Sequence, residues 1–396
     1  MTTNYKILGQ TAPVAATETL NYTVPSATSA LVRSINITNT AATADTYSIS
    51  IPPSVAAVAT PTFFAAISSS TTAATSTDGI TWTLRTLPSN LTWKMSAFGS
   101  GVFVTSGGLS AAYSTNGITW TATTLPASIN ADSIVYGNGK FVATGGGTTA
   151  SYSTDGITWT ATTMPSSSTW NSVTFGNGTF VSIASMTASA ASSTDGITWT
   201  LRTLPTTAFW YAVGFGNGVF VTTAISSTTA ASSTDGITWV LRTLPASNSW
   251  YTVTGGSGVI LALPGGSSTT AATSTDGSTW TARTVPASNW WATTYGNGKF
   301  VSVSNGTVPL VMSSTDGITW TTSTLPTGGA WQTVSYGTPA FVPATSNANY
   351  IAYNNTIPGN STMTIKAGYT LPTTAGIRVT STNGTSTFST FGAEIS

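Results

Sequence analysis

The segment SSTDGITW at residues 192–199 recurs along the chain with small changes. Its closing tryptophan has equivalents every 38 to 41 residues, which makes seven copies. An Asp-Gly or Asn-Gly pair precedes each tryptophan, and such pairs are typical of tight hairpin turns. The turn residues are Asp78, Asn116, Asp155, Asp195, Asp235, Asp276 and Asp316, and the tryptophans are Trp82, Trp120, Trp159, Trp199, Trp239, Trp280 and Trp320.

A second motif runs at the same period and resembles WNSVTFGNGTFV, residues 170–181. The motif begins with an aromatic anchor in six copies, Trp93, Trp170, Trp210, Trp250, Trp290 and Trp331. In the remaining copy, between Trp93 and Trp170, the anchor position holds Ala131. The two motifs use thirteen of the fourteen tryptophans and leave only Trp291. Most of the aromatic residues therefore have an architectural role.

Each period divides into four short strands. WNSVTF, TFVSIA and SAASS are three of them, with a Gly-Asn-Gly turn after the first. ITWTLRT is the fourth, and we expect Pro205 to end it because proline cannot donate to a strand ladder. Four strands in about 40 residues, repeated, are typical of a β-propeller blade. The sequence thus predicts an all-β chain with a seven-bladed propeller over residues 58–344.

The repeat also predicts how the ring closes. The first DGITW copy has no WNSVTF-like strand before it, and the last is followed by a surplus one, WQTVSYG at residues 331–337. We expect this surplus strand to pair with the strand near Phe63–Ile67. Such pairing joins the two ends of the ring and leaves no open sheet edge.

The motif STDGITW resembles the Asp-box of sialidase-type propellers but has one residue fewer between Asp and Gly. In that family the box is a structural hairpin far from the catalytic centre, which implies a structural role for the aspartates here. The local chemistry agrees, because Asp and Asn side chains accept backbone N–H groups at tight turns. Asn116 replaces Asp in one copy, which favours hydrogen bonding over acid–base chemistry.

Composition excludes several function classes. The chain has no His and no Cys, so Ser–His and Cys–His nucleophiles are absent and no zinc site, other metal or cofactor is expected. Apart from the turn aspartates, only Asp132 is acidic within the ring, whereas a glycosidase needs two carboxylates. Arg85, Arg202, Arg242 and Arg283 share one repeat position and should not converge. We expect a protein that is not an enzyme, binds no nucleic acid and does not insert into a membrane.

The two ends, residues 1–57 and 345–396, lack the repeat and each consists of alternating strand-like segments. Ring closure brings residues near 58 and 344 together. We therefore predict one discontinuous β-sandwich built from both ends, with the propeller inserted in it. Two independent small modules are the alternative.

The segments NYKILGQTAP at residue 4 and NYIAYNNTIPGNSTMTIKAGYTLP at residue 349 look like modules of virion structural proteins of tailed bacteriophages, especially marine cyanobacterial phages. This resemblance implies a capsid decoration, head-fibre or tail-associated subunit. Such a subunit is made in the host cytoplasm, sits on the particle surface and has other virion proteins as partners. Its attachment site, copy number and homo-oligomeric state stay open.

Two further functions remain as alternatives. In the first, the propeller binds a receptor or host-surface glycan, for which Phe209, Tyr211, Tyr251 and Trp291 are candidates because they cluster at the starts of adjacent repeats. These aromatics have a plainer interpretation, in which they pack between blades. The second alternative is a host-cell adhesion protein, which the lack of an apolar signal region at the N-terminus disfavours.

Overall fold

The computed structural model describes residues 4–11, 19–23, 29–39, 45–51, 62–126, 131–338, 349–357, 361–371, 376–381 and 386–395, with side chains for 62–126 and 131–338. Every regular element in these residues is a β-strand. The all-β class predicted from composition is therefore confirmed. None of the described residues forms a helix long and apolar enough to cross a bilayer.

The chain divides into two units, Met1–Ala59 with Val342–Ser396, and Thr60–Phe341. In the first unit, both sheets alternate strands from the two ends of the chain. One has the order β1(Asn4–Thr11), β34(Ser386–Ile395), β3(Ser29–Asn39), β32(Ser361–Leu371). The other has the order β2(Thr19–Thr23), β33(Gly376–Ser381), β4(Asp45–Ile51), β31(Asn349–Ile357), and all neighbours are antiparallel. Packing of the two sheets into a sandwich depends on side chains outside the described set, so the sandwich stays a prediction.

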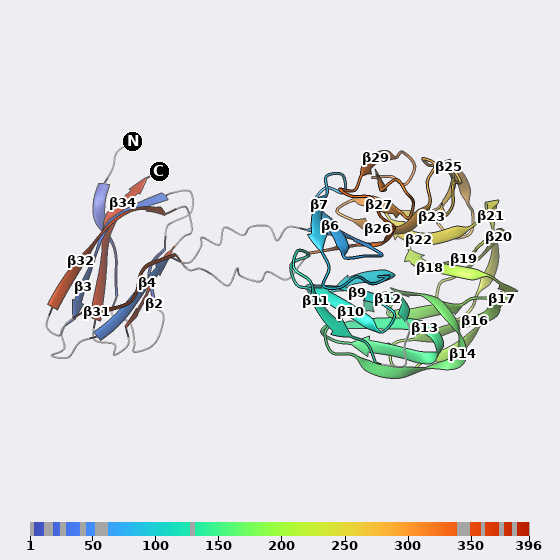
Figure 1. Ribbon diagram of the computed structural model, residues 1–396, viewed down its shortest axis with the longest axis horizontal. Coiled ribbons are helices and arrows are strands. Elements are labelled where there is room, and N and C mark those ends of the chain that lie inside the picture. Colours follow the sequence, from blue (N-terminus) through green and yellow to red (C-terminus); the bar gives the residue numbers. More distant parts are fainter. Residues whose placement is uncertain are drawn as a thin grey trace. The chain divides into compact units, whose positions relative to one another are not determined.

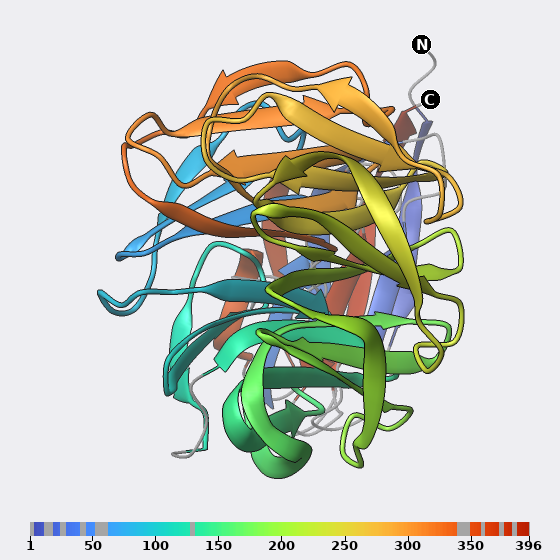
Figure 2. The same ribbon diagram turned by 90° about the vertical axis from the view of Figure 1, so that its right-hand side faces the viewer.

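The second unit is a β-propeller, as predicted, with sheets arranged in chain order around one centre (Figures 1 and 2). Five sheets have four antiparallel strands and one has six. In ring order they are β30(Trp331–Gly337), β5(Phe63–Ser68), β6(Thr72–Ser76), β7(Thr83–Thr86); β8(Met95–Gly99), β9(Val102–Gly107), β10(Ser110–Ser114), β11(Thr121–Thr124); β12(Ala131–Gly137), β13(Lys140–Ser153), β14(Thr160–Gly176), β15(Thr179–Ala184), β16(Thr187–Ser193), β17(Thr200–Ala208); β18(Trp210–Gly216), β19(Val219–Ala224), β20(Ser227–Ser233), β21(Val240–Asn248); β22(Trp250–Gly256), β23(Val259–Pro264), β24(Thr270–Ser274), β25(Thr281–Thr284); β26(Trp290–Gly296), β27(Lys299–Ser304), β28(Leu310–Ser314), β29(Thr321–Thr324).

The prediction of seven four-stranded blades is wrong, because the ring consists of six sheets. The six-stranded sheet carries two sequence repeats, since β14 serves as the outer strand of one repeat and continues into the inner strand of the next. β13 pairs with β14 through Gly146↔Thr169 and Gly147↔Ser168, and the next repeat keeps the equivalent pair Thr187↔Ala208. There, however, β17 ends at Ala208 and β18 begins at Trp210, so the strand is interrupted at one residue. The merging of two repeats into one sheet therefore depends on the continuity of β13 and β14, which a strand count by repeat could not reveal.

The expectation that Pro205 ends its strand is also wrong. β17 runs on to Ala208, and β16 pairs first with Thr203 and then with Ala208 across an irregularity. Pro205 lies in the skipped part, where no ladder N–H is required. A proline at a bulge therefore does not terminate the strand.

Ring closure is confirmed. β30 pairs with β5 from Trp331↔Ser68 to Gly337↔Phe63, so the last strand of the ring becomes the innermost strand of the first sheet. Phe64, Val301 and Trp331 pack in one buried cluster together with Trp82, which joins the first and last repeats through side chains as well. The propeller thus has no unpaired inner edge at the join.

Glycine–aromatic packing holds neighbouring inner strands together. A Cβ on Gly176 would lie 2.2 Å from the ring of Phe215, and one on Gly337 would lie 2.1 Å from the ring of Phe98. The residue must therefore be glycine for the aromatic ring of the next repeat to lie against the backbone. These contacts continue across the closure and fix the inner strands around a central cavity.

Candidate functional site

The inner strands of the repeats surround a cavity of about 380 Å³ at the centre of the propeller. Its wall comes from β8, β12, β14, β18, β22, β26 and β30, so every sequence repeat contributes to it. Part of its lining comes from the aromatic rings that pack on glycines near the ends of the inner strands, including Phe98, Tyr136 and Tyr336. The other end, where the inner strands begin, carries the side chains that differ between repeats.

Each of those side chains immediately follows the anchor of its inner strand. The strand pairing shifts register there in the six strands from β12 to β30, for example between Trp210 and Ala212 and between Trp250 and Thr252. Such a bulge redirects a side chain away from the regular sheet face. We call this set the mouth ring; it consists of Lys94, Asp132, Asn171, Tyr211, Tyr251, Trp291 and Gln332, all half-buried.

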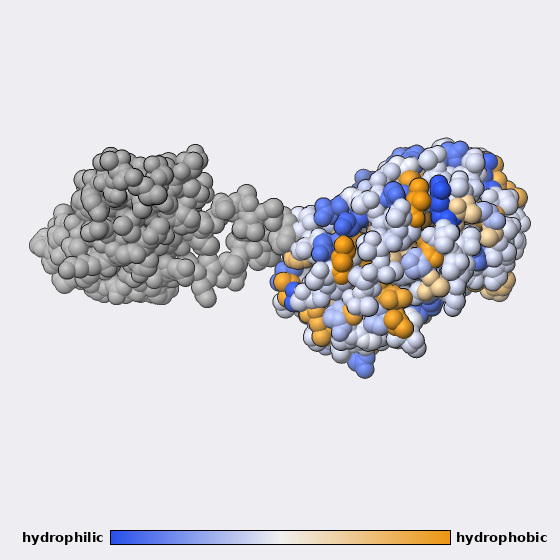
Figure 3. All heavy atoms as spheres, turned by 90° about the horizontal axis from the view of Figure 1, so that it is seen from above, coloured by the Kyte–Doolittle hydropathy of each residue, from blue (hydrophilic) through white to orange (hydrophobic). Residues whose placement is uncertain are grey.

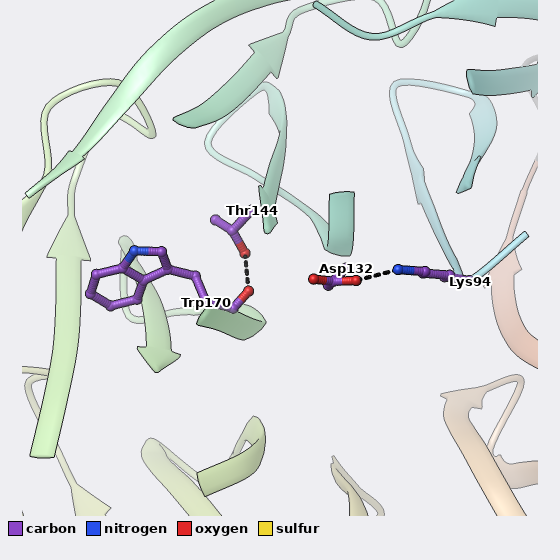
Figure 4. A network of polar contacts seen from close by, with 4 residues as sticks. All are labelled: Lys94, Asp132, Thr144 and Trp170. Atoms are coloured by element: carbon purple, nitrogen blue, oxygen red, sulfur yellow. Dashed lines mark hydrogen bonds and ion pairs between the residues drawn. The ribbon is translucent and has the colours of Figure 1, made fainter. Parts of the chain in front are cut away.

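One part of the mouth ring is polar and includes an ion pair. The ammonium group of Lys94 points toward the carboxylate of Asp132 and donates to its Oδ1 (Figure 4). The two side chains are 34% and 25% exposed, so solvent still reaches both. Asn171 follows on the next repeat, and its amide donates to the carbonyl of Trp210 at 3.4 Å.

The opposite part of the mouth ring is an aromatic arc of Tyr211, Tyr251 and Trp291. The ring centroids of Tyr211 and Tyr251 are 4.9 Å apart with planes tilted by 32°, and Tyr251 meets Trp291 edge-on at 4.9 Å. Tyr251 also lies against Gly265, where a Cβ would come within 2.1 Å of its ring. The arc is therefore held in place by its own contacts and by the loop after β23.

The phenol of Tyr211 stays neutral over the physiological range. Burial raises its pKa to about 12, with further contributions from the nearby Tyr251 and Asp132. A tyrosinate nucleophile would need the opposite shift. This residue can stack and donate a hydrogen bond, but it is a poor base.

The structure thus brings together three of the four aromatics singled out in the sequence. Phe209 is 52% exposed and does not line the cavity among the described residues. Sequence reasoning missed the other members of the mouth ring, Lys94, Asp132, Asn171 and Gln332, of which Asp132 and Asn171 line the cavity. They could have been found by aligning the repeats, because the residue after the anchor varies most while its neighbours recur.

The turn aspartates lie elsewhere, in the hairpins between the third and fourth strands of the repeats. In the turn before β17, Oδ1 of Asp195 accepts backbone N–H groups of Ile197 and Thr198, each at 2.8 Å, and the hydroxyl of Ser193. Asn116 accepts the two equivalent N–H groups at the same distances. The accompanying tryptophans, such as Trp199 and Trp239, pack in the hydrophobic clusters between neighbouring repeats.

Acid should weaken these turns. Burial alone would raise the pKa of Asp195, but hydrogen bonds from Thr198, Ile197 and Ser193 outweigh burial and lower this pKa to about 2. The pKa values of three other turn aspartates are also about 2, namely Asp78, Asp276 and Asp316. Because the folded-state pKa values lie below the ordinary 3.8, the stabilisation is complete above about pH 4 and is lost as pH falls toward 2. Thermal unfolding midpoints measured from pH 6 to pH 2 should therefore drop in this window. Unfolding midpoints that stay constant below pH 4 would contradict a stabilising role for the ionised turn aspartates.

Single substitutions separate hydrogen bonding from charge. Asp195→Ala should lower the free energy of unfolding by about 0.5–2 kcal/mol, as for loss of a side-chain cap on backbone N–H groups. Asp195→Asn should cost less, since Asn116 keeps the same two N–H contacts in its own turn. Urea unfolding of both variants measures the difference, and an equal loss in both would show that charge dominates.

The charged side chains of the propeller are divided between the cavity and the outer strands. Asp132 is the one carboxylate among the described lining residues, and it is paired with Lys94. The four arginines lie on outer strands, where each donates to a Ser or Thr of the neighbouring strand, as Arg202 does to Ser192 at 2.9 Å. No group of three or more metal-binding side chains occurs in the part of the chain with described side chains.

No protein-family model and no curated protein sequence matches this chain. Solved structures do: a streptogramin B lyase is 15% identical with a TM-score of 0.54, covering 65% of this chain and 94% of its own. A catalytically inactive variant of virginiamycin B lyase from Staphylococcus aureus, with quinupristin, is 12% identical with a TM-score of 0.53, covering 73% and 94%. YCF48 from Cyanidioschyzon merolae is 16% identical with a TM-score of 0.49, covering 72% and 95%. At these identities the similarity establishes the propeller fold alone.

Proposed function

We propose that the chain is a non-enzymatic structural protein of a tailed-phage virion, of the capsid decoration or head-fibre type. Its two terminal segments form a β-sandwich that docks on the particle, and the propeller is displayed outward. The observation that carries this proposal is the alternation of strands from both chain ends in each terminal sheet. A propeller inserted between β4 and β31 has two covalent connections to those sheets, which restrict its motion more than one linker would.

The resemblance of the terminal segments to virion modules supports the assignment. The propeller surface is also suited to display, because residues 62–338 carry seven basic and seven acidic side chains and hence no net charge. On the face seen in Figure 3 the apolar side chains are scattered among weakly polar ones. Such a surface depends little on ion pairs that salt would screen.

A lyase function is less well supported. The Staphylococcus aureus lyase solved with quinupristin is a catalytically inactive histidine-to-alanine variant, and the present chain contains no histidine. The cavity offers one paired carboxylate and a neutral tyrosine instead. We therefore propose no enzymatic role for it.

Docking can be tested on particles purified from the source culture. Chain lacking the propeller, with residues 1–57 joined to 345–396 by a short linker, should compete with the full chain for the particle surface. The terminal segments contain few charged residues, so binding should change less than about threefold between low and high salt. Competition by residues 58–344 instead of the joined ends, or absence of the protein from purified particles by mass spectrometry, would overturn the proposal.

A second candidate function is recognition of a receptor or host-surface glycan by the propeller. The mouth ring favours it, because it places three aromatic rings and several hydrogen-bonding side chains around one cavity. Binding of the full chain to immobilised host envelope polysaccharide tests this function. No retention on any host surface fraction would refute it.

A further inference from the structure

We propose that the mouth ring binds a single uncharged sugar residue of a glycan, stacked on the aromatic arc and hydrogen-bonded by the polar side chains opposite. This inference rests on the second candidate function above and is independent of virion docking. It assigns a ligand class, a site and a role to each part of the ring.

Comparison of the repeats within the chain indicates a specialised site. The anchor position is tryptophan in six repeats, and the residue that ends each inner strand is always glycine. Between these recurring residues, the mouth-ring position holds Lys, Asp, Asn, Tyr, Tyr, Trp and Gln in turn. If packing alone determined this position, one residue type should recur as it does at the anchors. Five of these varying side chains, those of Asp132, Asn171, Tyr211, Tyr251 and Trp291, line one cavity, and each follows an anchor at a strand bulge.

The distribution of chemistry around the ring fits a pyranose. A sugar ring has a face of C–H groups that packs on aromatic side chains and a rim of hydroxyls that need hydrogen bonds. Trp291 and Tyr251 provide the apolar surface on consecutive repeats. Asn171 and Asp132, which line the same cavity, supply an amide group and carboxylate oxygens. Gln332 occupies the equivalent position on the repeat that follows Trp291.

Electrostatics select an uncharged ligand. The charges of Lys94 and Asp132 cancel in their ion pair, and the other five members of the ring are neutral, including Tyr211 with its raised pKa. An acidic sugar would have to compete with Asp132 for Lys94, since the arginines lie on the outer strands. Placing its carboxylate near Asp132 would add like-charge repulsion.

The cavity volume sets the size of the ligand. About 380 Å³ lies near the lower end of the roughly 300–1,000 Å³ found for small-molecule sites. This space suits one sugar residue rather than a long chain. The rest of a glycan would extend from the mouth toward solvent, which suits recognition of a chain end.

The test uses the full-length protein and a panel of defined oligosaccharides. Gluco-, manno- and galacto-oligosaccharides represent uncharged ends, and sialylated and uronic-acid oligosaccharides represent acidic ends. We expect calorimetry to detect binding to at least one uncharged series and at least about tenfold weaker binding to the acidic ones. Preference for an acidic series would overturn the assignment of an uncharged ligand.

Substitutions locate the site. Trp291→Ala and Asn171→Ala should each weaken binding at least about tenfold, whereas Phe209→Ala removes an exposed aromatic outside the cavity and should leave it unchanged. Gly265→Ala provides a test that retains every ring side chain, because its Cβ would displace Tyr251 and should also weaken binding. Circular dichroism confirms that each variant is folded.

The outcomes distinguish this inference from the functions on which it builds. Glycan binding that survives Trp291→Ala and Asn171→Ala would overturn the mouth ring as the binding site. The propeller would then still recognise a glycan, but at another surface. Absence of binding to every oligosaccharide, together with retention on host polysaccharide, would overturn the single-sugar ligand. Neither result affects docking, which is measured on particles.

Discussion

A chain ending at residue 330 is expected to lose its cooperative unfolding transition, whereas a chain ending at residue 344 is expected to keep it. Both lack the C-terminal strands β31–β34, so the difference between them isolates β30. Without β30 the inner edge of β5 is unpaired, and the fully buried Trp331 is missing from the cluster that joins the first and last repeats. Loss of that one side chain costs about 3–5 kcal/mol, which is comparable with the whole stability of many domains.

Urea titrations of both truncated chains, followed by tryptophan fluorescence, measure this effect. The chain ending at 330 should unfold over a broad range and should aggregate, because an exposed strand edge pairs with other molecules. Equal midpoints and equal slopes for the two chains would show that ring closure does not determine the stability of the propeller.

Trp210→Ala is expected to lower the free energy of unfolding by about 3–5 kcal/mol. The indole is completely buried between two repeats, and its Nε1 donates to the carbonyl of Thr206 at 3.1 Å. The substitution leaves a large cavity that the surrounding strands cannot close, because hydrogen bonds within their sheets hold them in place.

The adjacent residue provides a matched control. Phe209 is 52% exposed, so Phe209→Ala should change stability by no more than about 0.5 kcal/mol. Chemical denaturation of both variants gives the comparison. If both variants lose similar amounts of unfolding free energy, the buried anchors are not the aromatic residues that determine packing.

The candidate site could be predicted only in part. Tyr211, Tyr251 and Trp291 were predicted because they cluster at the starts of adjacent repeats, and equivalent places in a propeller lie close together. The ion pair of Lys94 with Asp132 joins residues 38 positions apart. The repeat alignment places the two residues at equivalent positions, but their contact depends on how Lys94, which precedes β8, approaches the bulge at the start of β12.

The fold, like the site, could be predicted from the sequence only in part. Local spacing by itself determined the all-β class, the propeller and the pairing of residues 331–337 with the first sheet, because a repeated unit that buries its face only against copies of itself must form a ring or an array. Only the tertiary structure decided the number of sheets, the continuation of β17 past Pro205 and the orientation of the mouth ring. These features arise where strands bulge or stay paired beyond their expected ends. Whether a strand bulges or stays paired depends on hydrogen bonds and packing between segments, which the order of residues in one repeat does not specify.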